Sequence, residues 1–230
     1  MSLRQLAPVR WSAPLVLAGS RETSWVPVLA AGTYEGTLRE VLLAYKERGQ
    51  LSLRADLGEA LFRACVLALA SGGVIGAVSL VPVPSRRSAI RARGHDAVGA
   101  VARVAASRLR ASGYATDVAT VLRHSRAVAD QAGLGIDARR ANLHGALAAR
   151  PGRVRGRTVI VVDDIVTTGA TAAEAVRALH VAGATVRAVA AIAATPRRLP
   201  SGPNGHHRPA GPGVGSAGGH SAGAVDHGAG

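Results

Sequence analysis

The sequence predicts an α/β fold with a mainly parallel, twisted sheet and helices on both faces. Apolar runs typical of strands alternate along the chain with segments of helical spacing, which is the order of elements in such folds. The run TVIVV at residues 158–162 shows no polar alternation, as expected for a strand covered on both faces. Ligands of parallel sheets bind beyond the carboxyl ends of the strands, so polar residues at those ends are the first candidates for function.

Each element has its own signal. Four segments have helical spacing: residues 38–46, 54–71, 96–113 and 171–183. The third ends on Gly113, where a C-cap is expected, and the fourth begins with Thr171 and Glu174 at the spacing of a capping box. Strands are predicted at residues 77–83, 158–162 and 185–195, with a weaker one at 114–122.

Three regions of the chain differ in composition. Residues 1–30 contain prolines without a clear period and are predicted to be an irregular N-terminal leader. Residues 31–195 carry the alternating strands and helices and are predicted to form one domain, for which the 48% hydrophobic content of the 230 residues is ample. Residues 196–230 are rich in Gly, Pro and His without periodicity, so a disordered tail is expected.

The charge of the chain is strongly positive. The formal net charge is +14, and Lys46 is the only lysine among 28 basic residues. This balance favours polyanionic partners, namely phosphorylated metabolites or nucleic acid, and an arginine-rich surface without any partner explains it equally well. Aromatic residues make up only 3% of the chain, which argues against a protein dedicated to stacking on unpaired bases.

The cysteine content and one uncharged stretch limit the class of protein further. Cys65 is the only cysteine, which excludes an internal disulfide or a cysteine-based zinc site and predicts a small core residue. Residues 64–85 carry no charge over a length that could span a bilayer, but Gly72, Gly73 and Pro82 interrupt them. A helix, a turn and a strand are therefore predicted there, and with no convincing signal peptide we expect a soluble, cytoplasmic protein.

Asp163 and Asp164 stand side by side directly after the apolar run 158–162. Adjacent carboxylates repel each other and their burial costs stability, so we expect a functional reason for the pair. Two chemistries that place acids at the end of an apolar strand do not fit. A nucleotide triphosphatase needs a phosphate loop ending in Gly-Lys-Ser/Thr, whereas Lys46 lies in LAYKERG. A phospho-accepting receiver domain needs a further aspartate on a later strand, and the later acids lie in a helix and in the tail.

A third chemistry uses the whole segment. The small-residue loop TTGAT leads from the acids into a helix N-terminus, where free N–H groups and the helix dipole can receive a phosphate. Threonine hydroxyls add donors, and a glycine lets the backbone approach the ligand. The two acids can accept hydrogen bonds from vicinal hydroxyls, so diol and phosphate together describe a ribose 5-phosphate; the alternative is an exposed turn or a cap. The candidate phosphate-binding residues are Thr167, Thr168, Gly169, Ala170 and Thr171.

The segment VIVVDDIVTTGAT resembles the signature of type I phosphoribosyltransferases, which bind 5-phosphoribosyl-1-pyrophosphate (PRPP). The resemblance implies the phosphoribosyltransferase-type fold for residues 31–195. It also implies that Asp163 and Asp164 are catalytic residues that hold the ribose 2- and 3-hydroxyls, and that residues 167–171 wrap the 5-phosphate. Mg²⁺ would act as the cofactor, bound through PRPP and not directly by protein residues.

Other segments resemble the ComF family, which is named for its role in DNA uptake during competence. VPVPSRRSAIRARGHD is similar to that family's Val-Pro-Val-Pro stretch and the following Arg-x-Arg-Gly motif, and YEGTLREVLLAYKERG is similar to its segment before the core. The likeness covers roughly residues 31–194. A third segment, QAGLGIDARRANLHGA, matches the family's spaced residues at Gln131, Leu134, Arg139, Asn142, Gly145 and Ala146.

The chain also departs from the ComF pattern. The family commonly carries an N-terminal cysteine-rich zinc-binding segment, and these 230 residues hold none. Where the family usually reads Phe-Asn-Gln after the Arg-Gly, this chain has His95, Asp96 and Ala97. The second departure puts in question the contacts that the family makes there to an acceptor or partner. It lies outside the PRPP signature.

Two further segments are candidates for the rest of a PRPP site. Ser85, Arg86 and Arg87 follow the strand at 77–83 and are predicted to bind pyrophosphate, for which guanidinium groups are suited. The resemblance places a pyrophosphate loop there as well. It also implies that the long segment with Gln131, Arg139 and Asn142 is a flexible loop that closes over the reaction centre, since an activated ribosyl cation is readily hydrolysed. The histidines at 95, 124, 144 and 180 are scattered and are predicted to be surface or packing residues.

Two hypotheses of function follow. The first is a ComF-like phosphoribosyltransferase, a transferase of the glycosyltransferase class, that binds PRPP with Mg²⁺ and serves an acceptor that the sequence does not identify. The second is a non-catalytic DNA-uptake adaptor that keeps the fold and uses its arginines to bind single-stranded DNA or a competence helicase. A homodimer is compatible with both, and neither requires a membrane span.

Overall fold

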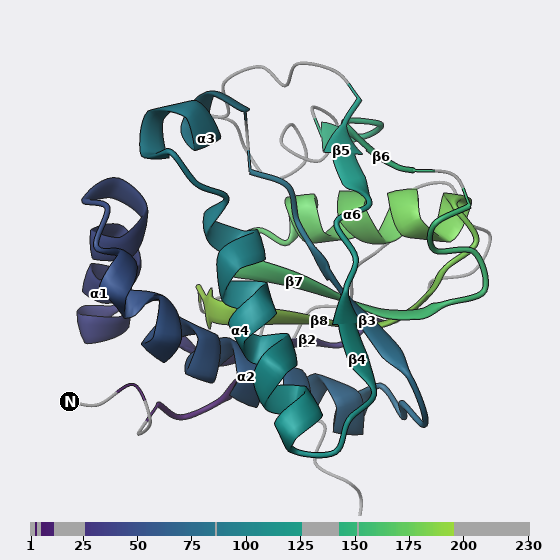
Figure 1. Cartoon of the computed structure of the whole chain (residues 1–230), viewed down its shortest axis with the longest axis horizontal. Coiled ribbons are helices and arrows are strands. Elements are labelled where there is room, and N and C mark those ends of the chain that lie inside the picture. Colours follow the sequence, from purple (N-terminus) through teal and green to yellow (C-terminus); the bar gives the residue numbers. More distant parts are fainter. Residues whose placement is uncertain are drawn as a thin grey trace, which may run out of the picture. The chain divides into compact units, whose positions relative to one another are not determined.

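Six strands form one sheet in the order β1-β2-β8-β7-β3-β4 (Figure 1). The computed structural model describes residue 3 and residues 6–11, 26–85, 87–125, 143–150 and 152–195, all within a unit formed by residues 1–197. From β2 to β4 each neighbouring pair of strands is parallel, and only β1 is antiparallel to its neighbour. The predicted mainly parallel sheet is confirmed. The strands are β1 Val9–Trp11, β2 Val28–Thr33, β3 Val78–Pro82, β4 Thr116–Val118, β7 Thr158–Val166 and β8 Thr185–Ala194.

Helices cover both faces of this sheet, and the side chains of β7 show how. Ile160 and Val162 belong to a core that also contains the buried residues of α2 and α4. Val159 and Val161 point into a second core with the buried residues of α6. All four side chains are fully buried, which explains why the strand sequence lacks polar alternation. The helices are α1 Gly36–Glu47, the 3₁₀ turn η2 Leu51–Leu53, α2 Arg54–Ser71, α3 Arg87–Arg93, α4 Ala97–Ala111 and α6 Ala170–Val181.

The four predicted helices are confirmed at α1, α2, α4 and α6, and the uncharged stretch at 64–85 is a helix, a turn and a strand as predicted. The turn is made by Gly72 and Gly73, and Gly73 has a φ of +58°, which favours glycine. Cys65 is buried in the core, and burial raises the pKa of its thiol to about 12, so it packs as a small apolar residue. Within the described residues, no helix has the length and apolar character needed to cross a membrane.

The N-terminal region differs from the expected irregular leader. Val9–Trp11 form the edge strand β1, and β2 begins at Val28, before the predicted start of the domain at residue 31. β2 is buried at five consecutive positions and pairs with β8, so its sequence shows no two-residue period that would mark it as a strand. The predicted tail at residues 196–230 lies outside the described residues.

The weak strand predicted at residues 114–122 is two short strands in different sheets. Thr116–Val118 form β4 at the edge of the large sheet, whereas Leu122–His124 form β5, which pairs with β6 Leu147–Ala149 in an antiparallel pair. The Ala119 N–H still donates to the Leu80 carbonyl at 2.9 Å, so the chain leaves the large sheet after this residue. Residues 126–142 join β5 to β6.

We predict that Gly58→Ala destabilises the fold, because α2 and α4 meet too closely for a side chain at this position. A Cβ at Gly58 would lie 2.3 Å from Cγ1 and 2.5 Å from Cβ of Val104. We expect the free energy of unfolding, measured by urea denaturation, to fall by about 1–3 kcal/mol. Helix propensity alone would raise it by roughly 0.5–1 kcal/mol, so a more stable variant would contradict the close packing.

Candidate functional site

The acid pair lies at the carboxyl end of β7, in the middle of the sheet. β7 does not stop at Val162 as predicted but continues to Val166, because Asp163 and Ile165 still pair with Ala191 and Ala193 of β8. On the other side, the Val83 N–H donates to the Val162 carbonyl at 2.9 Å, so the end of β3 lies directly beside the acids. The carboxyl ends of β3, β7 and β8 therefore meet at one edge, where ligands of parallel sheets bind.

Asp163 is a buried carboxyl group whose charged form is disfavoured. Its side chain is 8% exposed, and its Oδ1 accepts a hydrogen bond of 2.8 Å from the N–H of Asp164. Burial and the neighbouring charge of Asp164 raise the pKa of Asp163 well above its usual range, although the Asp164 N–H and Lys46 act in the opposite direction. The Asp164 N–H and Lys46 are therefore the contacts that favour the ionised form of Asp163.

Lys46 is the cation that contacts this pair, and the sequence patterns gave it no role. It lies in the last turn of α1, and its Nζ is 2.6 Å from Oδ2 of Asp164. Burial would lower the pKa of Lys46, but the charge and hydrogen bond of Asp164, with the charge of Asp163, raise it above its ordinary value against the opposing charge of Arg93. The sequence feature that could have identified Lys46 is that it is the only lysine in an arginine-rich chain. It also follows a tyrosine that is buried in the structure.

Apolar side chains close one side of the acid pair. Asp163 and Asp164 line a cavity of about 10 Å³ together with residues from α1, α2, α4 and β8. A space of this size holds about one water molecule and no larger ligand. A larger ligand therefore has to approach the acids from the carboxyl edge of the sheet. The apolar lining comes from Leu42, Tyr45, Leu61, Ala97, Val98, Val101 and Ile192.

The predicted phosphate loop leads from β7 into α6. Gly169 is the N-cap residue with a φ of +74°, a conformation that favours glycine, and α6 begins at Ala170. The Ala170 N–H lies 3.4 Å from Oγ1 of Thr168, and Thr167 is exposed. The first-turn N–H groups of a helix have no partner within the helix, so this end of α6 suits an anion. The structure thus brings residues 167–171 next to the acid pair.

The predicted capping box of Thr171 and Glu174 is wrong. Glu174 is buried and faces β6, where its Oε1 accepts a hydrogen bond of 3.0 Å from the Leu147 N–H. Arg177 donates to both carboxylate oxygens of Glu174 at 2.7 Å and to the Leu147 carbonyl at 3.1 Å. The Glu174 carboxylate, which the local pattern predicted to cap the helix N-terminus, makes a tertiary contact instead. This contact anchors α6 to the β5–β6 pair.

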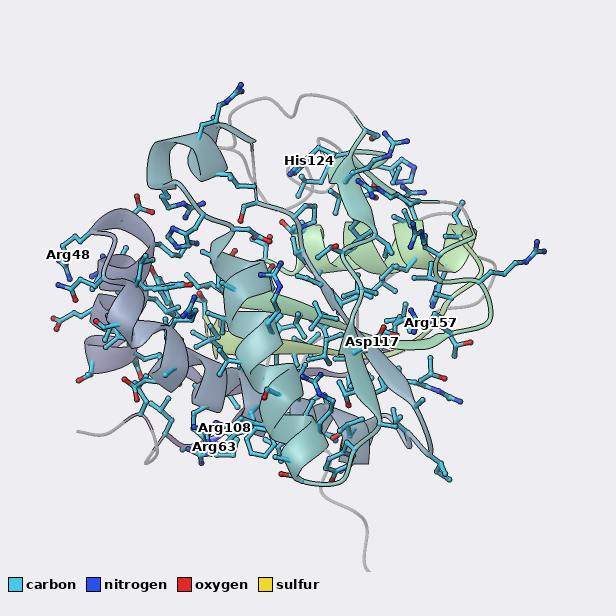
Figure 2. All side chains as sticks on the ribbon, viewed as in Figure 1. Arg48, Arg63, Arg108, Asp117, His124 and Arg157 are labelled. Atoms are coloured by element: carbon cyan, nitrogen blue, oxygen red, sulfur yellow. The ribbon has the colours of Figure 1, made fainter. Side chains whose placement is uncertain are left out.

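The residues predicted to bind pyrophosphate begin at the end of β3. Ser85 is partly buried and follows Pro84, whose carbonyl oxygen accepts a hydrogen bond of 3.1 Å from Nε2 of His124 on β5 (Figure 2). His124, expected to be a surface or packing residue, therefore ties the β5–β6 pair to this loop. Arg87 begins α3, whereas Arg86 and the side chain of Arg87 lie outside the described residues.

The residues predicted for the flexible loop also lie outside the described part of the chain. Gln131, Arg139 and Asn142 belong to the segment that joins β5 to β6. Its two ends are held together, because the Ser125 N–H donates to the Ala146 carbonyl at 2.9 Å and the Ser125 hydroxyl donates to the Gly145 carbonyl. The segment thus leaves and returns close to the loop that follows β3.

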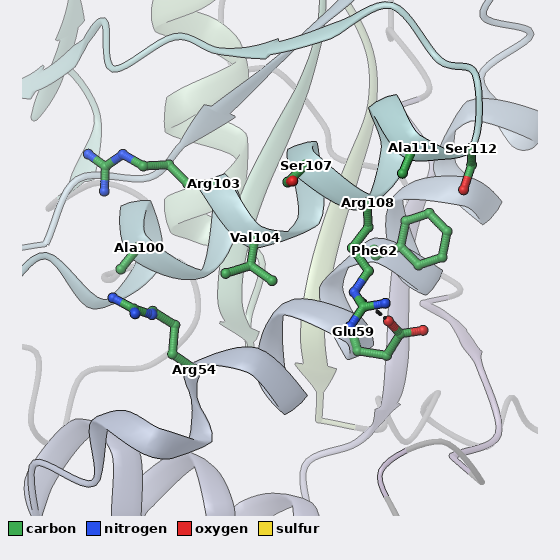
Figure 3. A pocket seen from close by; sticks show the side chains of 10 residues that line it. All are labelled: Arg54, Glu59, Phe62, Ala100, Arg103, Val104, Ser107, Arg108, Ala111 and Ser112. Atoms are coloured by element: carbon green, nitrogen blue, oxygen red, sulfur yellow. Dashed lines mark ion pairs between the residues drawn. The ribbon is translucent and has the colours of Figure 1, made fainter.

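A separate groove lies away from the acid pair, between α2 and α4 (Figure 3). Its volume is about 680 Å³, and arginine side chains from both helices line it together with Phe62, which lies at one end beside Arg108. Arg108 pairs with Glu59 at 2.9 Å, which offsets one of the positive charges. The other two arginines in the lining are Arg54 and Arg103.

The comparisons with known proteins give one match to a family model. Residues 89–202 match the family model described as "Phosphoribosyl transferase domain", a range that contains the acid pair, the phosphate loop, α6 and β8. The fold is thus of the phosphoribosyltransferase type, and the family match falls on the part of the chain that carries the candidate site. The chain carries a phosphoribosyl transferase domain, and no curated protein matches the sequence.

Two solved structures show partial similarity. One is the allosteric regulatory enzyme of purine biosynthesis, with 23% identity and a TM-score of 0.35, where the match covers 60% of this chain and 25% of that one. The other is the protein TT1426 from Thermus thermophilus, with 20% identity, a TM-score of 0.33 and coverage of 64% and 86%. The chain therefore spans about a quarter of the length of the first of these proteins.

We predict that Glu174→Gln loosens the β5–β6 pair. The amide has no charge and only one acceptor oxygen, so Arg177 loses one of its two hydrogen bonds to this side chain, and a broken hydrogen bond to a charged group costs about 1.5–3 kcal/mol. Amide hydrogen exchange at Leu147 should become faster by roughly tenfold or more. Glu40→Gln, at an exposed position on α1, is the matched control and should leave the exchange unchanged.

The same contact predicts a pH dependence of stability. Burial would raise the pKa of Glu174, but the hydrogen bonds and charge of Arg177 and the Leu147 N–H lower it below its usual value. The contact therefore stabilises the fold fully above the unfolded pKa, and this contribution is lost as the pH falls through the lower folded pKa. On acidification, the free energy of unfolding of wild type should lose this contribution, whereas that of Glu174→Gln should not. Parallel curves of unfolding free energy against pH for the two proteins would contradict the assignment.

Proposed function

We propose that this chain is a ComF-like protein that binds PRPP with Mg²⁺ and transfers the phosphoribosyl group to an acceptor. The observation that carries the proposal is the placement of the acid pair and the α6 N-terminus at the carboxyl end of the same central strand. A diol-binding group and a phosphate-binding group lie there at the two ends of one short segment, and the end of β3 lies beside them. PRPP carries a 5-phosphate, two ribose hydroxyls and a pyrophosphate, which correspond to these three places.

Asp163 and Asp164 accept hydrogen bonds from the ribose hydroxyls in this proposal. As the bond between the anomeric carbon and pyrophosphate breaks, its electron pair leaves with pyrophosphate and positive charge develops on the ring. The acceptor supplies a lone pair to the anomeric carbon and then loses a proton. Two carboxylates at the hydroxyls offset the developing charge, and they are already fixed in position by β7 before the ligand arrives.

The remaining groups of PRPP have candidate partners at the same edge. The 5-phosphate meets Thr167, Thr168, Gly169, Ala170 and Thr171 at the start of α6. The pyrophosphate meets Ser85, Arg86 and Arg87, whose loop is held by the His124–Pro84 hydrogen bond. Gln131, Arg139 and Asn142 lie on the segment between β5 and β6, which we propose closes over the ligand and excludes water.

We assign Mg²⁺ to the ligand and not to a set of protein side chains. Within the described residues, no group of three or more His, Cys, Asp or Glu side chains lies together. One of the two carboxylates at the site is also engaged by Lys46. The ion would offset charge on the pyrophosphate oxygens, which are ligands of the hard type that it prefers. The ComF relationship, a cytoplasmic location and a homodimer belong to the proposal on the strength of the sequence resemblance.

We predict that Asp163→Asn combined with Asp164→Asn abolishes PRPP binding measured by calorimetry in the presence of Mg²⁺. Each hydrogen bond to a carboxylate contributes about 1.5–3 kcal/mol, so the loss of both should weaken binding by at least about 100-fold. Asp56→Asn, on the exposed start of α2, is the control and should bind as wild type does. Absence of heat with the wild-type protein would overturn the proposed function.

A second candidate function is supported by the groove between α2 and α4. Arg54 and Arg103 are exposed and line it with Phe62, a combination that suits a nucleic-acid strand with one stacked base. In this alternative the fold serves as a non-catalytic adaptor for DNA uptake, which binds single-stranded DNA or a competence helicase. The groove does not contain the acid pair, so the two functions are separable by substitution.

For this alternative, we predict that Arg54→Glu plus Arg103→Glu weakens binding of an oligothymidylate. The slope of log affinity against log salt should become shallower by roughly 0.7 for each lost phosphate contact. Arg153→Glu plus Arg155→Glu, at exposed positions outside the groove, is the control. Equal losses in both variants would show that binding depends on overall charge and not on the groove, and PRPP binding should be unchanged in both.

A further inference from the structure

The last turn of α1 is fixed over the acid pair by two neighbouring side chains. Tyr45 is buried, and its hydroxyl donates to the Ala97 carbonyl at 3.4 Å, while its ring packs edge-on against His95 with 5.4 Å between centroids. Lys46 extends to Asp164 at 2.6 Å, with 25% of the lysine side chain and 15% of the aspartate side chain exposed. The lysine is thus held by a structured helix end and not by a loose surface contact.

The charge balance at this place gives the lysine a specific effect. Two adjacent carboxylates at the end of a buried strand repel each other, and without a cation one of them takes up a proton. A protonated carboxyl donates one hydrogen bond where a ribose hydroxyl also needs to donate, so the pair would then accept fewer hydroxyls. A cation in contact with Asp164 favours the form in which both groups accept.

Other charged and titratable groups surround this end of α1. Arg93 of α3 opposes the charge of Lys46, while Arg54 at the start of α2 and Asp96 at the start of α4 act on Tyr45. In the described part of the chain the ion pair of Asp164 is with Lys46. Removing the lysine therefore leaves the acid pair without the cation that touches it.

We propose that Lys46 is a positioning residue that keeps Asp163 and Asp164 together as acceptors for the two ribose hydroxyls. This inference rests on the proposed function, because it assigns the acids to a diol. The lysine acts through the acids and does not have to touch the reacting atoms. It differs from a lysine that only stabilises the fold, whose loss would weaken binding equally at every pH, and from one that blocks the site, whose loss would tighten binding.

The test is calorimetry with PRPP and Mg²⁺ from about pH 5.5 to pH 9 on wild type, Lys46→Met and Lys46→Arg. Loss of the cation should shift the acidic limb of binding upward by about one pH unit, since a tenfold effect corresponds to one pKa unit. Lys46→Met should therefore bind about tenfold more weakly at low pH and approach wild type at high pH. Lys46→Arg should restore most of the low-pH affinity. Arg48→Met removes an exposed charge two residues away and is the control.

A second measurement does not depend on the ligand. Carbon-13 titration of the aspartate carboxyl groups in the ligand-free protein should show the acid pair taking up its proton at higher pH in Lys46→Met than in wild type. An unchanged titration, an equal loss of affinity at all pH values, or tighter binding by the variant would each overturn the inference. If wild type gives no heat with PRPP, the proposed function fails, and the carboxyl titration alone decides whether Lys46 controls the acid pair.

Discussion

The parallel pairing of β7 with β3 and β8 is the constraint on which the site depends. These pairs bring three strand ends to one edge, so residues far apart in the sequence arrive together: the loop after β3, the acids of β7 and the α6 N-terminus. Because β7 continues through Asp163 to Val166, the sheet itself fixes the backbone of the acids. A ligand then finds its acceptors already in place, which lowers the ordering cost of binding.

The same arrangement lowers the stability of the fold, and other contacts offset this loss. An acid pair at the end of a buried strand is unfavourable, and the structure answers with the Asp164 N–H at Asp163 and with Lys46 at Asp164. Replacing buried charges by apolar residues is often stabilising. The chain nevertheless has two carboxylates at this position. The acid pair is therefore more consistent with the proposed role in ligand binding than with a role in stability.

Features that depend on residues close together in the sequence were predictable, and features that depend on residues far apart in the sequence were not. TVIVVDD and TTGAT are local patterns, and they correctly located β7, the acids and the start of α6. Lys46 was not predictable as a site residue, because its partner lies on a strand far along the chain. Glu174 fitted a capping box locally, but the fold offered it the Leu147 N–H and Arg177 instead. β2 was missed because a strand buried on both faces lacks the alternation that marks a strand.

The contacts outside the acid pair show why the small β5–β6 pair belongs to the site. His124 joins it to the loop after β3, and Glu174 with Arg177 joins it to α6, so its two attachments are the two elements assigned to pyrophosphate and 5-phosphate. A pair of three-residue strands has little stability of its own and takes its position from these attachments. The two strands that flank residues 126–142 are therefore each held beside a group that we propose to contact PRPP.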